Sequence, residues 1–369
     1  MIYLDDPNID ESDLKYVNKA ILDGDISTRG NYIKQFENAI SNYLGGPHCI
    51  ATNTGSASLL VALKILGIGM GDEVIVPACT FAATVNAIKM VGAKPVFVDI
   101  DQETWNIDLK QIYKIITERT RVIVPVHLYG NPCDMDEIKY QAKHVLHIYF
   151  NSPYLVKNKQ KIFIVEDACE SFGATCDTYY TGVIGDIGCF SFNRNKTITT
   201  GGGGMIVTKN PDLAKQARQF INQGRDENGK AVGPGFNFRM VNQNAALGLS
   251  QLKQLKEFLD KKSYFAYQYW TLLSDCKNIK FQLMKDGRDR HSYWFTAIKI
   301  NTQKVGKTIP QIQEELQAKG IPTRRIFEPL AQLPNAIDFY ENGLCLPSST
   351  KNTYEDIEYI AKTLLEVLN

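Results

Sequence analysis

The residues of this chain that are best suited to chemistry lie in the stretch CFSFNRNKTITTGGGGM, residues 189–205. A strand-like run ends at Phe192, Lys196 follows four residues later, and four consecutive glycines come after it. A lysine amine forms an imine with an aldehyde when it is neutral and rigidly held. Glycines allow positive φ angles and close approach of a ligand. A surface lysine before a glycine-rich turn is the alternative, and this stretch alone does not decide between the two.

Two phosphate-binding motifs do not fit these glycines. The G-x-x-x-x-G-K-[ST] loop is excluded because the lysine precedes the glycines. The G-x-G-x-x-G motif is excluded because the run leads into the strand-like MIVT and not into a helix.

Acidic residues close a second strand-like run, in the segment VEDACE at 165–170. A carboxylate there can face a cationic ring nitrogen. In pyridoxal-phosphate chemistry this pair keeps the pyridine protonated, so that the ring acts as an electron sink. A helix cap or a metal ligand is an equally good interpretation of such an aspartate.

Two further segments complete the set. NTGSASLL (53–60) places a glycine and small hydroxyl residues at a helix start, where free N–H groups and the helix dipole favour phosphate. Simple capping by Thr54 or Ser56 is the alternative. In PACTFAAT (77–84) an aromatic residue, Phe81, follows a strand, where it can stack on a flat heterocycle or pack in the core. Together, a phosphate turn, an aromatic, a carboxylate and a lysine at strand ends predict one cofactor site.

The elements that position these residues follow an α/β pattern. Strands that are apolar throughout and separated by helix-like stretches indicate a mostly parallel sheet with helices on both faces. Ligands of such sheets bind beyond the carboxyl ends of the strands. The predicted strands are HCIAT, EVIVP, KPVFVDI, RVIVPVHLYG, KIFIVEDA, IGCFSF and GMIVT.

The pattern changes near residue 240. A long helix begins at Asn242 and is followed by the strand candidate HSYWFTAIKI, a helix containing QIQEELQAKG and a closing helix from about Tyr354. We therefore predict a large domain over 1–240 and a smaller α+β domain, with the connecting helix, over 241–369. The polar segment NSPYLVKNKQ (151–160) is predicted to be an exposed loop.

Composition narrows the class of partner. The 41 basic and 40 acidic residues give a net charge of +1, so neither nucleic acid nor a membrane is expected as a partner. No apolar run approaches the roughly 20 residues of a spanning helix, and the acidic N-terminus is unlike a signal peptide. The eight scattered cysteines show neither disulfide nor metal spacing. We expect them to be buried and reduced, no metal, and a cytoplasmic location.

These motifs together resemble the DegT/DnrJ/EryC1/StrS sugar aminotransferases, which have the aspartate aminotransferase fold of pyridoxal-phosphate enzymes. The resemblance runs through nearly the whole chain, from STRGNYIKQFENAI (27–40) to IPTRRIFEPL (321–330). It implies that Lys196 holds the cofactor as a Schiff base and shuttles the proton. The other implied cofactor contacts are Gly55, Ser56, Ala57 and Ser191 at the phosphate, Phe81 and Asp167 at the ring, Glu170 near the hydroxyl, and Asn237 reaching over from the neighbouring subunit of a homodimer. The implied substrate contacts are His127, Tyr129, His291 and Arg324.

The resemblance also suggests the reaction. Segments such as NKTITTGGGGM and HSYWFTAI are most similar to perosamine synthase-like C4 aminotransferases. The expected substrates are a nucleotide-linked 4-keto-6-deoxyhexose and L-glutamate. Here four glycines replace the family's Gly-Glu-Gly-Gly, and Arg324-Arg325-Ile326 replaces its Arg-Pro-Phe. Amination of a 3-keto sugar and a catalytically silent regulator remain alternatives. A nicotinamide-dependent sugar dehydratase would need a glycine-rich turn at the start of the first helix, and this sequence has no such turn. A relative that deoxygenates C3 has histidine in place of the lysine, so Lys196 argues against that activity.

Overall fold

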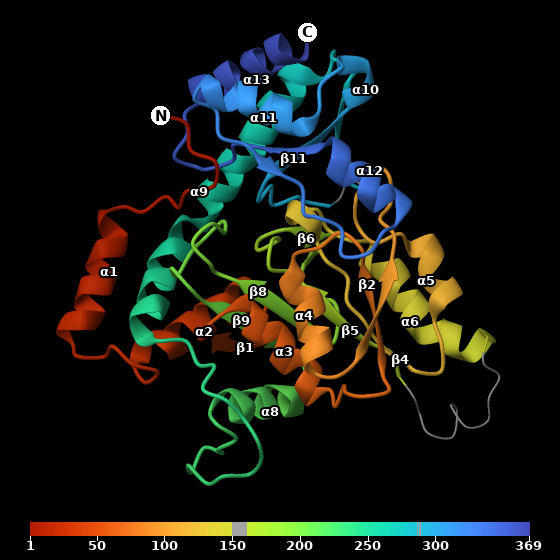
Figure 1. The fold of residues 1–369 in the computed structure, drawn as a ribbon. Helices are drawn as coiled ribbons and strands as arrows, with labels where there is room; N and C mark the ends of the chain where they lie inside the picture. The colour runs from red at the N-terminus through yellow and green to blue at the C-terminus, as the bar shows by residue number, and fades with distance from the viewer. Residues whose placement is uncertain (150–160, 286, 288) are drawn as a thin grey trace.

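The strands of the large sheet are apolar on both faces. In β2 (Glu73–Pro77), Val74 and Val76 pack into the core on one face, and Ile75 packs into the core on the other. Because side chains alternate in direction along a strand, such a run needs helices on both faces. The computed structural model, which describes residues 1–149, 161–285, 287 and 289–369, has this three-layer arrangement (Figure 1).

All seven predicted strands form one sheet. They are β1 (His48–Thr52), β2, β3 (Lys94–Val98), β4 (Thr120–Ile123), β5 (Phe163–Asp167), β8 (Ile187–Ser191) and β9 (Gly204–Thr208), in the order β1-β9-β8-β5-β4-β2-β3. β9 is antiparallel to both of its neighbours, and the other neighbouring strands are parallel. The mostly parallel sheet is therefore confirmed.

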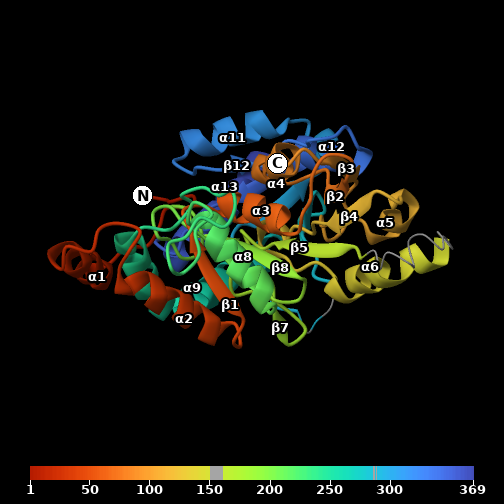
Figure 2. The same cartoon turned by 90° about the horizontal axis from the view of Figure 1, so that it is seen from below.

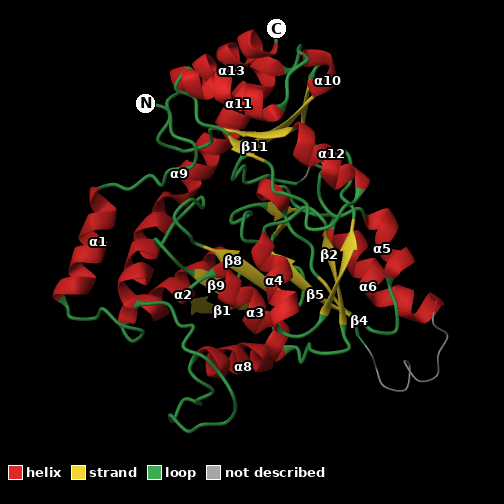
Figure 3. Ribbon diagram, in the orientation of Figure 1, coloured by secondary structure: helices red, strands yellow, loops and turns green. Residues whose placement is uncertain are grey.

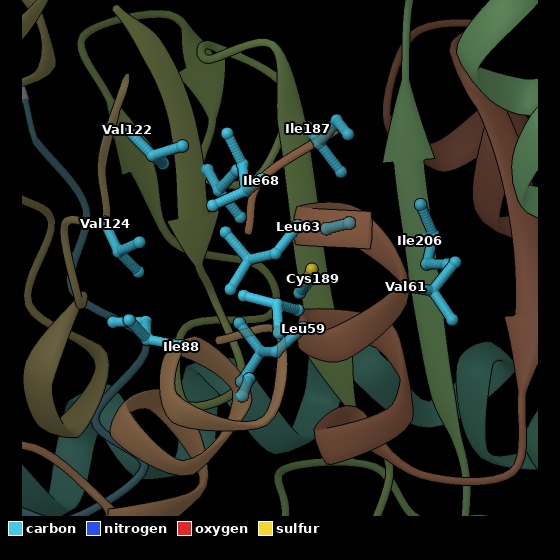
Figure 4. Packing of buried hydrophobic residues seen from close by; sticks show 14 of the residues in the cluster. Leu59, Val61, Leu63, Ile68, Ile88, Val122, Val124, Ile187, Cys189 and Ile206 are labelled. Atoms are coloured by element: carbon cyan, nitrogen blue, oxygen red, sulfur yellow. The ribbon is translucent and has the colours of Figure 1, made fainter. Parts of the chain in front are cut away.

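Helices cover the two faces of this sheet. On one face lie α3 (Gly55–Ile65), α4 (Ala82–Met90) and α8 (Pro211–Ile221). On the other lie α2 (Asn31–Tyr43), α5 (Leu109–Ile115), α6 (Met135–Tyr149) and the first half of α9 (Asn242–Leu273), as the view from below shows (Figure 2). Figure 4 shows the core between the sheet and the first of these helix layers, where Leu59 and Leu63 of α3 meet Val122, Ile187 and Cys189 of the strands. α1 (Glu11–Leu22) packs against α9.

A second sheet forms the smaller part of the molecule. Its four strands are antiparallel, in the order β10 (Ile279–Phe281), β11 (Thr296–Ile300), β13 (Gly343–Leu346) and β12 (Arg324–Arg325). α11 (Ile309–Ala318), α13 (Tyr354–Leu368) and the end of α9 cover one face (Figure 3). The opposite face packs with α12 (Pro334–Asn342) against loops of the large sheet. The short elements are β6 (Thr175–Cys176), β7 (Tyr179–Tyr180), η1 (Leu128–Gly130) and α10 (Thr302–Val305).

The long helix α9 belongs to the cores on both sides of the predicted boundary at residue 240. Its 32 residues span about 48 Å at 1.5 Å per residue. The N-terminal segment also joins the two parts, because Tyr3 exchanges two hydrogen bonds of 2.8 Å with Asn352. The division into 1–240 and 241–369 stays a prediction.

One further expectation differs from what the structure describes, and a second is not tested by it. The strand predicted from His291 begins at Thr296, because Tyr293 has a φ of 49° and interrupts the extended chain. The predicted loop at 151–160 lies outside the described residues. All eight cysteines are free, five of them buried. Among the described residues, no helix has both the length and the apolar character needed to cross a membrane.

Candidate active site

The predicted chemical residues gather around one cavity of about 230 Å³, beyond the ends of β5 and β8. Parallel neighbours place their carboxyl ends at the same edge of a sheet, which is where ligands of such folds bind. The lining residues that concern the site are Thr54, Gly55, Ser56, Phe81, Asp167, Cys169, Glu170, Ser191, Asn195, Lys196, Trp294 and Arg324. The phosphate turn, aromatic, carboxylate and lysine are thus brought together.

Lys196 is not a surface lysine. Only 13% of its side chain is exposed, and its Nζ lies 4.0 Å from Glu170 Oε1. The same Nζ lies 3.6 Å from the centre of the Trp294 ring. A rigidly held amine in a walled cavity is what imine chemistry requires.

Asp167, the last residue of β5, is buried and turned into the cavity. Its Oδ2 accepts a hydrogen bond of 2.6 Å from Thr84 Oγ1, and its Oδ1 accepts one of 3.2 Å from the N–H of Cys169. Within the described ranges, no three His, Cys, Asp or Glu side chains are grouped as a metal ion would need. The two hydrogen bonds hold the carboxylate in place at the cavity.

The phosphate turn is the N-terminus of α3. Thr54 caps it, because its Oγ1 accepts a hydrogen bond of 3.0 Å from the N–H of Ala57. The first N–H groups of a helix have no intrahelical partner, and Gly55 and Ser56, which begin α3, line the cavity, so this helix start is suited to an anion. Ala57 is outside the cavity lining, and its N–H is bonded to the cap, so its predicted phosphate contact stays a prediction that the structure does not support.

Close backbone approach explains two of the glycines in the site. A Cβ on Gly55 would lie 2.9 Å from both Cys169 Sγ and Ser191 Cβ. A Cβ on Gly204 would lie 2.4 Å from the carbonyl oxygen of Thr54. Ser191, the last residue of β8, lines the cavity beside this turn.

Phe81 lies at the N-cap of α4, and 54% of it is exposed. It is therefore available for stacking and is not a core residue. Its ring centre lies 5.6 Å from that of Phe327. The guanidinium carbon of Arg324 lies 5.0 Å from the Phe327 ring centre and 5.7 Å from the Trp294 ring centre. Phe81, Trp294 and Arg324 line the cavity, and the buried Phe327 packs behind them.

Glu170 lies beneath Lys196 and is buried. Burial raises the pKa of Glu170 to about 7, while the Lys196 ammonium and a hydrogen bond of 2.8 Å from the N–H of Tyr129 act in the opposite direction. A carboxyl group whose ionisation is balanced near neutral pH is common at functional sites.

The structure does not place three of the predicted substrate contacts in the cavity lining. His127 is fully buried: its Nε2 lies 3.1 Å from Glu166 Oε2, and its Nδ1 accepts the N–H of Cys133. His291 is also buried, with Nε2 3.2 Å from Gln282 Oε1. Burial lowers the pKa of His291 to about 3, so this ring is neutral. Both imidazoles have hydrogen-bond partners inside the protein, and their roles as substrate contacts stay predictions.

Tyr129 is the third predicted substrate contact outside the cavity lining, and its role stays a prediction. It is buried outside the cavity lining with a φ of 56°, and its hydroxyl accepts the N–H of Phe327 at 3.0 Å. Tyr129 therefore supports Glu170 through its own N–H. Asn237 is exposed, outside the lining of its own chain's cavity, and accepts a hydrogen bond from Arg239 Nε. Its predicted reach into a neighbouring subunit stays a prediction. Of the four substrate residues, Arg324 alone lines the cavity.

Sequence reasoning missed Thr84 and Trp294. Thr84 follows Phe81 by three residues, so both lie on the first turn of α4, and this spacing was a usable signal. Trp294 lies in a segment that is typical of a strand, where an aromatic indicates core packing, so nothing in the local pattern marked it.

The residues present fit pyridoxal phosphate. The buried Asp167 has no cationic partner among the described side chains. A pyridinium nitrogen of the cofactor would supply the missing positive charge. The helix start at Gly55 suits a phosphate, and Lys196 suits an aldehyde. The fold and the site together define the class of pyridoxal-phosphate-dependent transferases.

Comparisons with known proteins identify the family within this class. The model of the DegT/DnrJ/EryC1/StrS aminotransferase family matches residues 7–365. GDP-perosamine synthase of Escherichia coli O157:H7 is 36% identical, over 98% of this chain and 96% of that protein. The 3-oxo-glucose-6-phosphate:glutamate aminotransferase of Bacillus subtilis is 34% identical, over 88% and 70%. A solved sugar aminotransferase of Streptococcus pneumoniae, Spr1654 in its PMP form, has a TM-score of 0.91 and 29% identity, over 100% and 99%.

This chain belongs to the DegT/DnrJ/EryC1/StrS aminotransferase family. It is an enzyme, its cofactor is pyridoxal phosphate, and its fold is that of the pyridoxal-phosphate-dependent sugar aminotransferases. These predictions from the sequence are confirmed.

Proposed function

We propose that this enzyme transfers the amino group of L-glutamate to the C4 ketone of a nucleotide-linked 4-keto-6-deoxyhexose. The observation that carries the proposal is the buried amine of Lys196 in the cavity that also contains Asp167. The full-length similarity to GDP-perosamine synthase supports amination at C4. A second candidate, amination at C3, is favoured by the similarity to the 3-oxo-glucose-6-phosphate:glutamate aminotransferase.

Pyridoxal phosphate supplies an aldehyde that binds amines and a ring that withdraws electrons from the reacting carbon. Lys196 Nζ takes the proton from the α-carbon of glutamate and later delivers a proton to C4 of the sugar. A positioned acid–base group of this kind contributes roughly 10²–10⁴-fold to the rate. Asp167 keeps the ring nitrogen protonated, and Thr84 holds the carboxylate in place.

The remaining contacts orient the cofactor. We assign the phosphate to the N–H groups of Gly55 and Ser56 and to the hydroxyl of Ser191, because these residues line the cavity. Phe81 is placed to stack on the ring, and Glu170 lies next to the reacting amine. Each of these roles is a proposal from position and chemistry.

Arg324 is the residue that we assign to the donor's carboxylate. Aromatic rings hold its guanidinium, and within the described ranges no carboxylate forms an ion pair with it. Its N–H groups are therefore available for an anion from the cavity, and a guanidinium matches a carboxylate in a bidentate way. This supports L-glutamate as the amino donor.

We also propose a homodimer in which Asn237 of one chain completes the site of the other, because this exposed residue is outside its own chain's cavity. A cytoplasmic location is supported by the eight free cysteines, which are typical of reducing compartments.

The test is a substrate screen with the purified holoenzyme. We expect 2-oxoglutarate when L-glutamate is combined with a UDP-, GDP- or dTDP-linked 4-keto-6-deoxy sugar, and NMR should place the new amino group at C4. An amino group at C3 would establish the second candidate instead. No 2-oxoglutarate with any keto sugar would favour the catalytically silent alternative. Dimerisation is checked by light scattering.

A further inference from the structure

Trp294 contacts two consecutive residues of the turn that carries the reactive amine. Its indole Nε1–H donates a hydrogen bond of 2.6 Å to the carbonyl oxygen of Asn195. Its ring centre lies 3.6 Å from Lys196 Nζ. One side chain thus fixes both the backbone of the turn and the end of the lysine side chain.

Other contacts also restrain this turn and its lysine: Asn195 Nδ2 donates a hydrogen bond of 2.9 Å to Asp5 Oδ2, and Glu170 Oε1 lies 4.0 Å from Lys196 Nζ. The N–H of Lys196 donates to the carbonyl of Asn193 at 3.1 Å, which is a bond within the turn itself. A lysine amine sits on a flexible four-carbon stem. The face of an aromatic ring attracts an ammonium group and limits the positions that the stem can take.

Trp294 is itself held rigidly. Its ring is stacked with those of Tyr129 and Phe327, with interplanar angles of 19° and 27°. Its carbonyl oxygen accepts a hydrogen bond of 3.2 Å from Nζ of Lys262, a buried residue of α9 that also donates to the Ser348 carbonyl at 2.7 Å. The indole is therefore fixed on its ring faces and at its backbone, and is suited to hold a mobile partner.

We propose that Trp294 is a positioning residue of the reaction, whose ring and indole N–H together hold the Lys196 amine at the carbon that loses or gains the proton. This inference rests on the amino transfer proposed above, but not on the identity of the sugar. A small displacement of a reacting group, about 1 Å, lowers rates by roughly 10²-fold, so a lysine that loses this support should move protons more slowly.

Arg324 provides the rival explanation. Its guanidinium carbon lies 5.7 Å from the same ring centre. If Trp294 acted only by supporting Arg324, its loss would raise KM for glutamate. If it holds Lys196, its loss lowers the rate of proton transfer at saturating glutamate. The two roles separate in a KM-against-rate measurement.

The experiment compares Trp294→Phe with wild type, each as holoenzyme, in the half-reaction with L-glutamate followed through cofactor absorbance. Phenylalanine keeps a stacked ring but loses the indole N–H and part of the face. We expect the maximal rate to fall by about 10- to 100-fold, with KM changed less than twofold. The kinetic isotope effect with α-deuterated glutamate should rise. Trp270→Phe, at an exposed tryptophan of α9, is the matched control and should behave as wild type.

A second readout does not depend on turnover. Pyridoxal phosphate is added to the cofactor-free full chain, and samples are treated with borohydride at successive times. The amount of cofactor attached to the Lys196 peptide then gives the rate of cofactor loading. We expect Trp294→Phe to load about tenfold more slowly, with an unchanged far-UV spectrum. Wild-type rates in both assays, a defect confined to KM, or an equal loss in Trp270→Phe would overturn the proposal. If wild type itself does not react with glutamate, the proposed donor fails, while the loading rate still tests Trp294.

Discussion

Replacing Glu170 with glutamine should make the stability of the chain less sensitive to pH. Burial raises the pKa of Glu170 from 4.5 to about 7. A group whose folded pKa is raised stabilises the fold fully below its unfolded pKa, and this contribution is lost as the pH rises through the folded pKa. Ionisation of the buried carboxyl therefore weakens the wild-type fold between about pH 4.5 and pH 7.

The size of the effect follows from the shift. One pKa unit corresponds to about 1.4 kcal/mol, so the wild type loses about 3 kcal/mol relative to Glu170→Gln between pH 4 and pH 8. Glutamine keeps an oxygen that can accept the N–H of Tyr129. Urea unfolding of both cofactor-free chains at several pH values measures the difference. If the difference between the two free energies of unfolding stays constant across this range, the reasoning is refuted. It is also refuted if the wild type becomes more stable relative to the variant as the pH rises.

The other predictions concern the cofactor site and one buried histidine. Thr84→Val removes a hydrogen bond to the ring-facing carboxylate; bonds to charged groups contribute about 1.5–3 kcal/mol, so titration with pyridoxal phosphate should show affinity at least about tenfold lower. Gly55→Ala brings a Cβ within 2.9 Å of two side chains and should weaken cofactor binding in the same titration, whereas Gly69→Ala, with its nearest neighbour at 3.7 Å, should not. His291→Gln should lose less stability in acid than the wild type. The unfolded wild type binds a proton at this histidine below about pH 6.5, whereas the folded protein binds it only near pH 3. Thermal melts from pH 7 to pH 4 measure this, and an equal fall of Tm in both chains would contradict it.

The sequence predicted most of the fold because its local signals agree with one another. The closing helix α13 begins at Tyr354 as predicted, since Thr353 and Asp356 form a capping box. The apolar strands predicted the sheet and the edge at which ligands bind. By contrast, the strand predicted from His291 begins only at Thr296. Tyr293 has a positive φ that interrupts the extended chain, and no residue pattern in the sequence predicts it.

The site was predicted less evenly. Lys196 and Asp167 lie in one cavity lining, as expected for residues at or just beyond strand ends, because strand ends of a parallel sheet meet at one edge. The roles of His127 and His291 stay predictions, since residue type alone does not distinguish a buried imidazole with internal partners from one that contacts a substrate. Trp294 was missed because its contact with Lys196 joins segments almost a hundred residues apart, which only the tertiary structure brings together.

The most direct test of the account is to find which residue binds the cofactor. Purified protein should be yellow with pyridoxal phosphate, and borohydride should attach the cofactor to the peptide that contains Lys196, as mass spectrometry can show. Lys196→Ala should fold, bind the cofactor without covalent attachment and lose turnover. Label on a different lysine, no binding at saturating pyridoxal phosphate, or rapid turnover by Lys196→Ala would contradict the central claim.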